Sequence, residues 1–239
     1  MNSSQLRGYL TGLILGDAHI DNGVAKRALR LKSINLDFIQ QVYSDLDITT
    51  NFKMFIKDVA GYTDKYGTNH KDYQELYIKA HPYFSKIYHH FYDDYRGRVI
   101  SKWAKTYLNV QGLANWFMSD GYTTLVGRTS GKITHRRVEL CTDRYGEDGA
   151  YAVSEYFNSC GYRTRSFKRG KVFRVRFYLD SAQDFLCDIS EYVVPSMKYK
   201  LYLAYDYRPT WMSDDYFKLM NDIKNSAYPR IFAGEEIVH

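Results

Sequence analysis

The sequence contains few of the residues that characterise secreted, disordered or zinc-stabilised proteins. It has 3 cysteines among 239 residues, at Cys141, Cys160 and Cys187, and no Cys-x-x-Cys pair. Widely spaced cysteines in odd number argue against a disulfide framework and against a structural zinc site, and they favour a reducing, intracellular setting. The 4 prolines and the 45% content of hydrophobic residues argue against extended disorder.

The sequence also lacks an apolar run long enough to cross a bilayer, and residues 1–5 do not open a secretory signal. It has no Gly-x-x-x-x-Gly-Lys-Ser/Thr phosphate loop and no Gly-x-Ser-x-Gly nucleophile turn. We therefore expect a soluble intracellular protein with no membrane partner and a chemistry other than these two. An organelle, a bacterium and a phage-infected cytoplasm are equally compatible with it.

Positive charge is modest in total but ordered along the chain. A net charge of +6 and a pI near 9.0 suit a nucleic-acid partner, although many unrelated domains reach these values. In the segment 26–32, the period-two alternation of a strand puts Lys26, Arg30 and Lys32 on one face and Leu29 and Leu31 on the other. This segment is thus expected to have one core face and one basic face.

Two further segments repeat this alternation, with Arg174 and Arg176 in residues 172–179 and Lys53 and Lys57 in residues 51–57. A solvated sheet face would explain any one of them, but three basic strands distributed over both halves indicate a DNA-facing surface. The residues expected to contact DNA are Lys26, Arg30, Lys32, Lys53, Lys57, Arg136, Arg165, Lys168, Arg174 and Arg176.

Two apolar segments, residues 10–18 and 113–121, each end in one carboxylate, Asp17 and Asp120. An ordinary buried helix with an acidic edge would explain one copy, but not the repetition. A carboxylate at the end of an apolar helix is costly to bury without a partner. Two such ends brought together would form an oxygen-rich site for a hard divalent cation, which suits metal-assisted hydrolysis.

A similar series of elements follows each motif. In the first half we expect helices at 4–17, 36–47 and 82–95 and strands near 18–21, 25–34, 51–59 and 73–80. In the second half we expect helices at 108–120, 145–160 and 181–192 and strands near 121–127, 134–142, 163–168 and 171–179. Hairpin tips are expected at 62–69 and 168–171, and a peripheral helix at 213–226.

The motif residues resemble those of the LAGLIDADG homing endonucleases in their single-chain form with two motifs. The first motif matches the family pattern at Leu10, Gly12, Leu13, Ile14 and Asp17, and the second at Leu113, Ala114, Asp120 and Gly121. Residues 195–201, Pro-Ser-Met-Lys-Tyr-Lys-Leu, resemble the end of the family's second repeat. The resemblance spans about residues 5–203.

This resemblance implies an α+β fold of two pseudo-symmetric αββαββα repeats, at 1–100 and 101–204, followed by a C-terminal extension at 205–239. Each repeat would carry a four-stranded antiparallel DNA-binding sheet, and the two packed motif helices would join the repeats. Gly12 and Gly16 share one helical face, where small residues allow two backbones to approach. The second helix offers Asn115 and Ser119 there, so either Asn115 donates a hydrogen bond across the interface or the packing is looser.

By the same resemblance, Asp17 and Asp120, with the preceding Gly16 and Ser119, hold Mg²⁺, for which Mn²⁺ can substitute. The family also places a basic residue beside each carboxylate. Lys200 aligns with the family lysine in the second repeat, whereas the first repeat offers Arg98, which differs in type and register. A phosphate-contacting or solvated cation is the alternative for both.

The implied function is that of a site-specific homing endonuclease, monomeric with an internal pseudo-two-fold axis. It would make a double-strand break with short 3′ overhangs in an asymmetric DNA target of roughly 20 bp, one helical turn per repeat. An RNA maturase that assists splicing of its own intron and a non-catalytic DNA-binding regulator are the alternatives. The presence of both Asp17 and Asp120 favours the nuclease.

Overall fold

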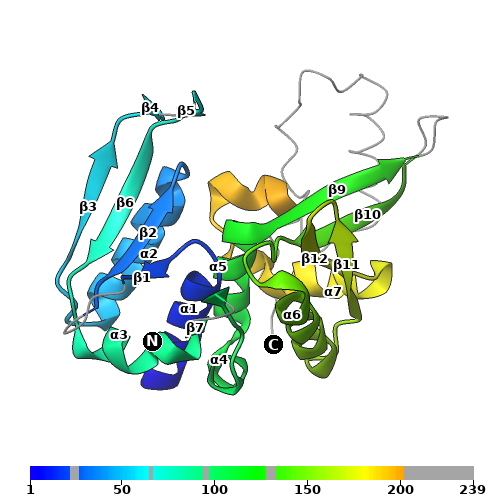
Figure 1. The fold of residues 1–239 in the computed structure, drawn as a ribbon, viewed down its shortest axis with the longest axis horizontal. Coiled ribbons are helices and arrows are strands. Elements are labelled where there is room, and N and C mark those ends of the chain that lie inside the picture. The colour runs from blue at the N-terminus through cyan, green and yellow to red at the C-terminus, as the bar shows by residue number, and fades with distance from the viewer. Residues whose placement is uncertain (22–26, 65–66, 94–96, 128–132, 202–239) are drawn as a thin grey trace.

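The computed structural model describes residues 1–21, 27–64, 67–93, 97–127 and 133–201 (Figure 1). The main elements of the first half are α1 (Ser3–Leu15), β1 (His19–Ile20), β2 (Leu29–Ser33), α2 (Leu36–Thr49), β3 (Met54–Val59), β6 (Tyr73–Ile78) and α3 (Pro82–Ile87). Those of the second half are α5 (Val110–Asp120), β9 (Gly121–Gly127), β10 (Ile133–Leu140), α6 (Gly146–Ser159), β11 (Thr164–Arg169), β12 (Val172–Phe177) and α7 (Leu179–Ile189). The expected extension at 205–239, including its helix at 213–226, lies outside the described residues.

Each half contains one four-stranded antiparallel sheet, and the two sheets have equivalent strand orders. The order is β1-β2-β6-β3 in the first half and β9-β10-β12-β11, its counterpart, in the second. Figure 1 shows the two sheets on either side of α1 and α5, which lie against each other in the middle of the molecule. The expected α+β fold with two αββαββα repeats is confirmed.

Alternation along the strands separates a buried face from a polar outer face, as the sequence predicts. Leu29 and Leu31 of β2 are fully buried and pair with Ile78 and Leu76 of β6. Arg30, between the two leucines, points to the outer face and is partly exposed. The core therefore lies between the sheets and the helices, and the outer faces of the sheets remain available for a partner.

The segment expected as one helix at 82–95 is interrupted, and that prediction is wrong. After α3, a 3₁₀ turn (Tyr88–His90) leads into a short hairpin of β7 (Tyr92–Asp93) and β8 (Gly97–Arg98). Phe91 explains the break, because its ring is fully buried while its N–H donates to Tyr88 O and its carbonyl accepts from Val99 N, both at 3.0 Å. The hairpin carries Arg98 back to the end of α1.

Three smaller elements complete the fold. β4 (Tyr62–Thr63) pairs with β5 (Asn69–His70), which forms the hairpin expected at 62–69. A helix, α4 (Lys102–Tyr107), precedes α5, and a 3₁₀ segment (Pro195–Leu201) follows α7, and neither was expected from the sequence. In the part of the chain that the structure describes, no helix combines the length and apolarity needed to span a membrane.

Candidate active site and DNA-facing surface

Glycines allow α1 and α5 to pack in backbone contact. A Cβ on Gly12 would lie 1.8 Å from Gly112 O, and a Cβ on Gly112 would lie 2.2 Å from Gly8 O. Neither distance is possible for a real side chain, so these positions require glycine at this crossing. The sequence predicts Gly12 in this interface but not Gly8 or Gly112, although Gly8 lies one helical turn before Gly12 on the same face.

The polar residue in the interface is also accommodated. The Asn115 side chain is buried and donates from Nδ2 to Tyr9 O at 3.4 Å, across the two helices. Of the two outcomes that the sequence leaves open, the structure has the hydrogen bond. Toward the carboxyl ends, a Cβ on Gly16 would lie 2.6 Å from Ser119 Cβ, so the helices remain in contact up to the residues that precede the two aspartates.

This contact places Asp17 and Asp120 beside each other. Asp17 follows Gly16, which ends α1 with its N–H donating to Gly12 O, and Asp120 is the last residue of α5. Burial raises the pKa of Asp120 to about 7, and the charge of Asp17 adds to this rise. Burial also raises the pKa of Asp17. The pair is therefore costly to ionise unless a cation shares the site.

Arg98 and Lys200 occupy equivalent places at the two helix ends. Arg98 is buried and donates to three carbonyl oxygens of the α1 end, those of Leu15 and Ala18 at 3.0 Å each and that of Gly16. Lys200 donates to the carbonyls of Met118 and Ser119 at the end of α5. Burial lowers the pKa of Lys200, and the charges of the two aspartates partly oppose that change. Each cation thus satisfies carbonyls that the helix leaves unpaired.

A third cation, Arg144, was missed from the sequence. It lies in the connection between β10 and α6, and its charge lowers the pKa of both Asp17 and Asp120. The next residue, Tyr145, is buried and donates from its hydroxyl to Leu15 O at 2.6 Å, which ties this connection to the end of α1. No local sequence signal links Arg144 to Asp17, because the two meet only through the packing of the repeats.

The donor set fits a hard divalent cation. A divalent ion bound between the two desolvated carboxylates would offset their mutual repulsion. The carbonyls of Gly16 and Ser119, residues that the resemblance implies as ligands, lie beside the carboxylates. Each of these carbonyls accepts a hydrogen bond from Arg98 or Lys200 and retains a second lone pair. Among the described residues no cluster of three or more His, Cys, Asp or Glu side chains could hold a metal ion. The remaining oxygens would therefore come from water and a bound phosphate, as is usual for Mg²⁺.

The outer face of the second sheet is rich in arginine. Arg174 forms a two-point ion pair with Asp143, from Nε and Nη2 at 2.9 Å each, and Arg176 pairs with Glu139. Arg165 lies directly opposite Arg176 in the adjacent strand. Arg165, Arg174 and Arg176 were predicted from the sequence, but Glu139 was not, since its place beside the arginines depends on strand register.

The first sheet is more balanced in charge. Arg30 lies 3.1 Å from Asp21 and 3.5 Å from Glu75, while Lys32, Lys53 and Lys57 are exposed.

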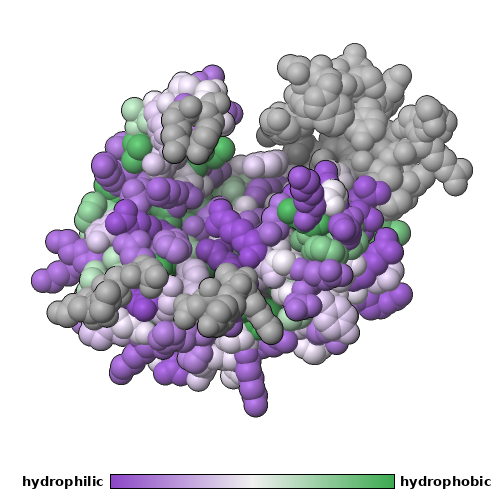
Figure 2. All heavy atoms as spheres, viewed as in Figure 1, coloured by the Kyte–Doolittle hydropathy of each residue, from purple (hydrophilic) through white to green (hydrophobic). Residues whose placement is uncertain are grey.

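The other residues expected to contact DNA are placed differently. Lys168 is in register with Phe173, whose ring lies 5.8 Å from its Nζ, and so it faces away from Arg174 on the neighbouring position. Lys26 lies outside the described residues, and so does the side chain of Arg136, whose backbone pairs with Leu125. In Figure 2, hydrophilic residues gather over the region between the two halves.

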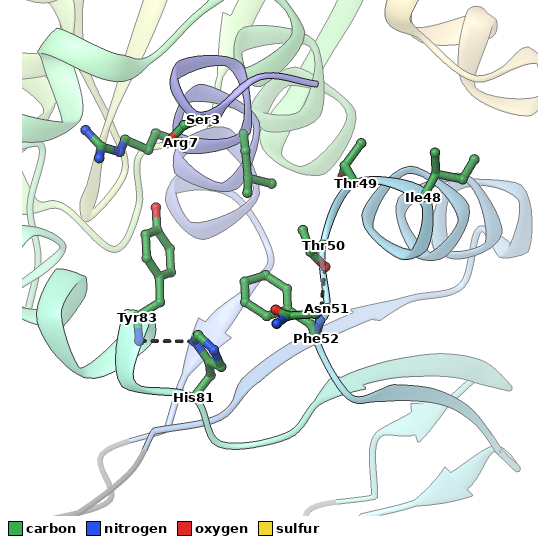
Figure 3. Close-up of a pocket in the computed structure, with 10 residues that line it drawn as sticks. Ser3, Arg7, Ile48, Thr49, Thr50, Asn51, Phe52, His81 and Tyr83 are labelled. Carbon is green, nitrogen blue, oxygen red and sulfur yellow. Dashed lines mark hydrogen bonds between the residues drawn. The ribbon is translucent and has the colours of Figure 1, made fainter.

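A cavity of about 600 Å³ lies away from this site. It is lined by residues of α1 near its amino end, including Ser3 and Arg7, and by Phe52, His81 and Tyr83 (Figure 3). Asp17 follows the opposite end of α1, so the cavity is not part of the acidic site.

Two αββαββα halves whose motif helices cross at glycines and bring two carboxylates together define a double-repeat protein with a single shared site. The model of the LAGLIDADG DNA endonuclease family matches residues 7–185 of the chain. A probable intron-encoded DNA endonuclease 3 from Mycosarcoma maydis is 30% identical over 127 residues, which cover 51% of this chain and 88% of that protein. The chain belongs to the LAGLIDADG DNA endonuclease family.

A solved structure agrees on the fold. The homing endonuclease I-WcaI bound to its DNA recognition sequence superposes with a TM-score of 0.68 at 18% identity, covering 83% of this chain and 86% of that chain. The α+β arrangement of two sheets around paired helices is thus shared at low sequence identity.

Proposed function

We propose that the protein is a site-specific homing endonuclease that hydrolyses one phosphodiester bond in each strand of a DNA duplex. The observation that carries the proposal is the convergence of Asp17 and Asp120 at the carboxyl ends of α1 and α5. The charges of Arg98, Lys200 and Arg144 act on both carboxylates. A carboxylate pair surrounded by cations suits a phosphodiester and a divalent ion better than it suits a neutral substrate.

Asp17 and Asp120, with the carbonyls of Gly16 and Ser119, would hold Mg²⁺, and Mn²⁺ would be accepted in its place. When bound, the ion supplies activation of water and stabilisation of the leaving 3′ oxygen. Arg98 fixes the end of α1 and so the position of Asp17. Lys200 does the same for Asp120 and, because burial lowers its pKa, it is the better suited of the two to exchange a proton. Arg144, which is exposed, is placed to offset charge on a phosphate.

The two sheets would lie along the major groove, with the carboxylates over the centre of the site. Each repeat would cover one helical turn, which gives an asymmetric target of roughly 20 bp. Because the outer faces of the two sheets carry different side chains, the two half-sites would differ. Cleavage of both strands across the minor groove would leave short 3′ overhangs, and one chain would suffice as a monomer.

Cleavage by carboxylate variants tests the proposal. Purified protein is incubated with Mg²⁺ and duplex DNA from a host locus that lacks the intron, or with a library of randomised duplexes. Asp17→Asn and Asp120→Asn are expected to abolish double-strand cleavage and to keep sequence-specific binding, whereas Asp47→Asn, which alters an exposed carboxylate of α2, is the matched control.

Full cleavage by either active-site variant would refute the assignment of the pair. Specific binding without any cleavage in Mg²⁺ or Mn²⁺ would support the DNA-binding regulator instead. If the protein bound intron RNA, accelerated its splicing and cleaved no DNA, the maturase would be supported.

A further inference from the structure

One carboxylate lies beneath the arginines of the second sheet. Glu139 lies near the end of the inner strand β10, in register with Tyr122 of β9 on one side and with Arg176 of β12 on the other. Figure 1 shows β10 within the second sheet. The side chain of Glu139 is 2% exposed. A carboxylate buried to this degree is stable only when its oxygens are paired.

Both oxygens of Glu139 are occupied by neighbouring side chains. Oε1 lies 2.7 Å from Nε and 2.6 Å from Nη2 of Arg176, and 3.9 Å from Nε of Arg137. Oε2 accepts a hydrogen bond from the Tyr122 hydroxyl and lies 3.5 Å from Nη1 of Arg169. Glu139 therefore has little surface and few lone pairs left to offer to DNA.

Tyr122 extends the network to two arginines. Its hydroxyl accepts hydrogen bonds from Arg169 Nη1 at 2.5 Å and from Arg174 Nη1 at 3.4 Å, while it donates to Glu139. The guanidinium of Arg176 stacks 4.1 Å from the centre of the Phe167 ring. These contacts with Glu139, Tyr122 and Phe167 restrict the directions of the arginine side chains. The side chains of Arg169 and Arg137 nevertheless retain 56% and 38% exposure.

Without Glu139 these cations would repel one another. Burial lowers the pKa of Arg137, and the positive charges of Arg176 and Arg169 lower it further. Freed arginines would separate and turn toward the nearest negative charges, which on a DNA duplex are the phosphates. Phosphate contacts carry affinity but no sequence information, whereas an arginine held with its fork toward the groove can read a guanine edge.

The first sheet does not contain this arrangement at the equivalent position. Arg30 of β2 is in register with His19 of β1 and with Tyr77 of β6. Glu139 has the corresponding position in the second sheet, so the first sheet has a cation where the second has its carboxylate. The effect of the carboxylate should therefore be confined to the half-site read by the second repeat.

From this geometry we infer that Glu139 is a specificity-determining positioning residue, which directs Arg137, Arg169 and Arg176 toward base edges and restrains them from the phosphates. The inference rests on the proposed DNA recognition, and Glu139 itself touches no DNA. A carboxylate in a DNA interface normally weakens binding to all sequences alike. The loss of Glu139 should strengthen non-specific binding and, unlike the loss of such a carboxylate, weaken the discrimination between DNA sequences.

The test compares Glu139→Gln with the wild type by selection from randomised duplexes and by titration of selected and unrelated DNA at several salt concentrations. Glu139→Gln is expected to reduce the ratio of specific to non-specific affinity about tenfold, the order of one lost arginine–guanine contact. The slope of log affinity against log salt should become steeper by about one phosphate contact. Base preference should broaden only in the second-repeat half-site.

Two further variants keep the result interpretable. Asp58→Asn makes the same change of charge in the first sheet, where Asp58 accepts a hydrogen bond from Gln74, and it should leave base preference unchanged. Tyr122→Phe removes the bridging hydroxyl but keeps the ring, so it should broaden the same positions to a smaller degree even if Glu139→Gln fails to fold.

The outcomes separate the two proposals. A wild type with no sequence preference overturns the proposed function, and this inference with it. A selective wild type whose preference is unchanged in the variants, or broadened equally in both half-sites, overturns the role of Glu139 alone.

Discussion

Asp120→Asn should stabilise the metal-free protein, and the gain should depend on pH. The pKa of this carboxyl is about 7 in the folded protein, against 3.8 for an ordinary aspartate. Each unit of pKa difference corresponds to about 1.4 kcal/mol, so keeping Asp120 ionised in the folded state costs about 4 kcal/mol. Asparagine has a similar shape and carries no charge, so it avoids that cost.

The sign follows from proton binding. Below pH 3.8 the carboxyl is protonated in both states and contributes nothing. Between pH 3.8 and about 7 the folded protein keeps a proton that the unfolded chain has lost, so the free energy of unfolding falls as the pH rises. At about pH 5 roughly 1.5 kcal/mol of the cost is present, and at about pH 8 all of it. The gain from Asp120→Asn should therefore be about 2.5 kcal/mol larger at the higher pH.

Urea unfolding in EDTA measures this directly for wild type and variant at both pH values. Asp47→Asn on the exposed side of α2 is the control and should change stability by less than about 0.5 kcal/mol at either pH. An equal gain at both pH values would refute the raised pKa. Added Mg²⁺ should stabilise the wild type at high pH and leave Asp120→Asn almost unchanged, because a ligand stabilises only the state that binds it.

Three further predictions concern the helix crossing, the basic residues and the sheet faces. Gly12→Ala should lower the free energy of unfolding by about 2–4 kcal/mol, since its Cβ would lie 1.8 Å from Gly112 O, and a urea midpoint within error of the wild type would contradict that packing. Lys200→Met should slow cleavage of one strand far more than the other, so that nicked plasmid accumulates; equal slowing on strand-labelled duplexes would remove Lys200 from a single active site. Arg174→Ala should relax the base preference at one or two base pairs by about 1–3 kcal/mol, whereas Lys53→Ala should weaken binding to all sequences alike. If Arg174→Ala weakened binding uniformly in a randomised-site assay, Arg174 would be assigned to the DNA backbone instead.

The sequence predicts those features that depend on local pattern. Alternation identifies the core and outer faces of the strands at 29–33 and 172–177, because the side-chain period of a strand is two. The second strand was expected to reach 179 but ends at Phe177. The apolar motif helices and their terminal aspartates are contiguous in sequence, so their repetition is visible without a structure. The spacing of four residues from Gly8 to Gly12, which puts both on one helical face, is a further local signal for the crossing.

The residues that could not be predicted are those brought together by packing between distant elements. Phe91 interrupts the helix expected at 82–95 because its ring enters the core, which is a tertiary effect that overrides local propensity. Arg144 reaches the carboxylates only because Tyr145 fixes its connection to the end of α1. The arginines lie around Glu139 because of the registers between neighbouring strands. The sequence of any one strand does not indicate these registers.

The ends of α1 and α5 also show why stability and chemistry are linked in this site. A helix ends with unpaired carbonyls, and a cation placed on them is favoured by hydrogen bonding and by the helix dipole. Arg98 and Lys200 are therefore explained by structure alone, but the same two charges also partly oppose the rise that burial causes in the pKa of Asp17 and of Asp120. The carboxylates in turn favour the charged form of Lys200 against its burial. The cations and the carboxylates thus partly offset the cost of each other's burial. A bound divalent ion would enter a site whose positive charges are already positioned by the helix ends.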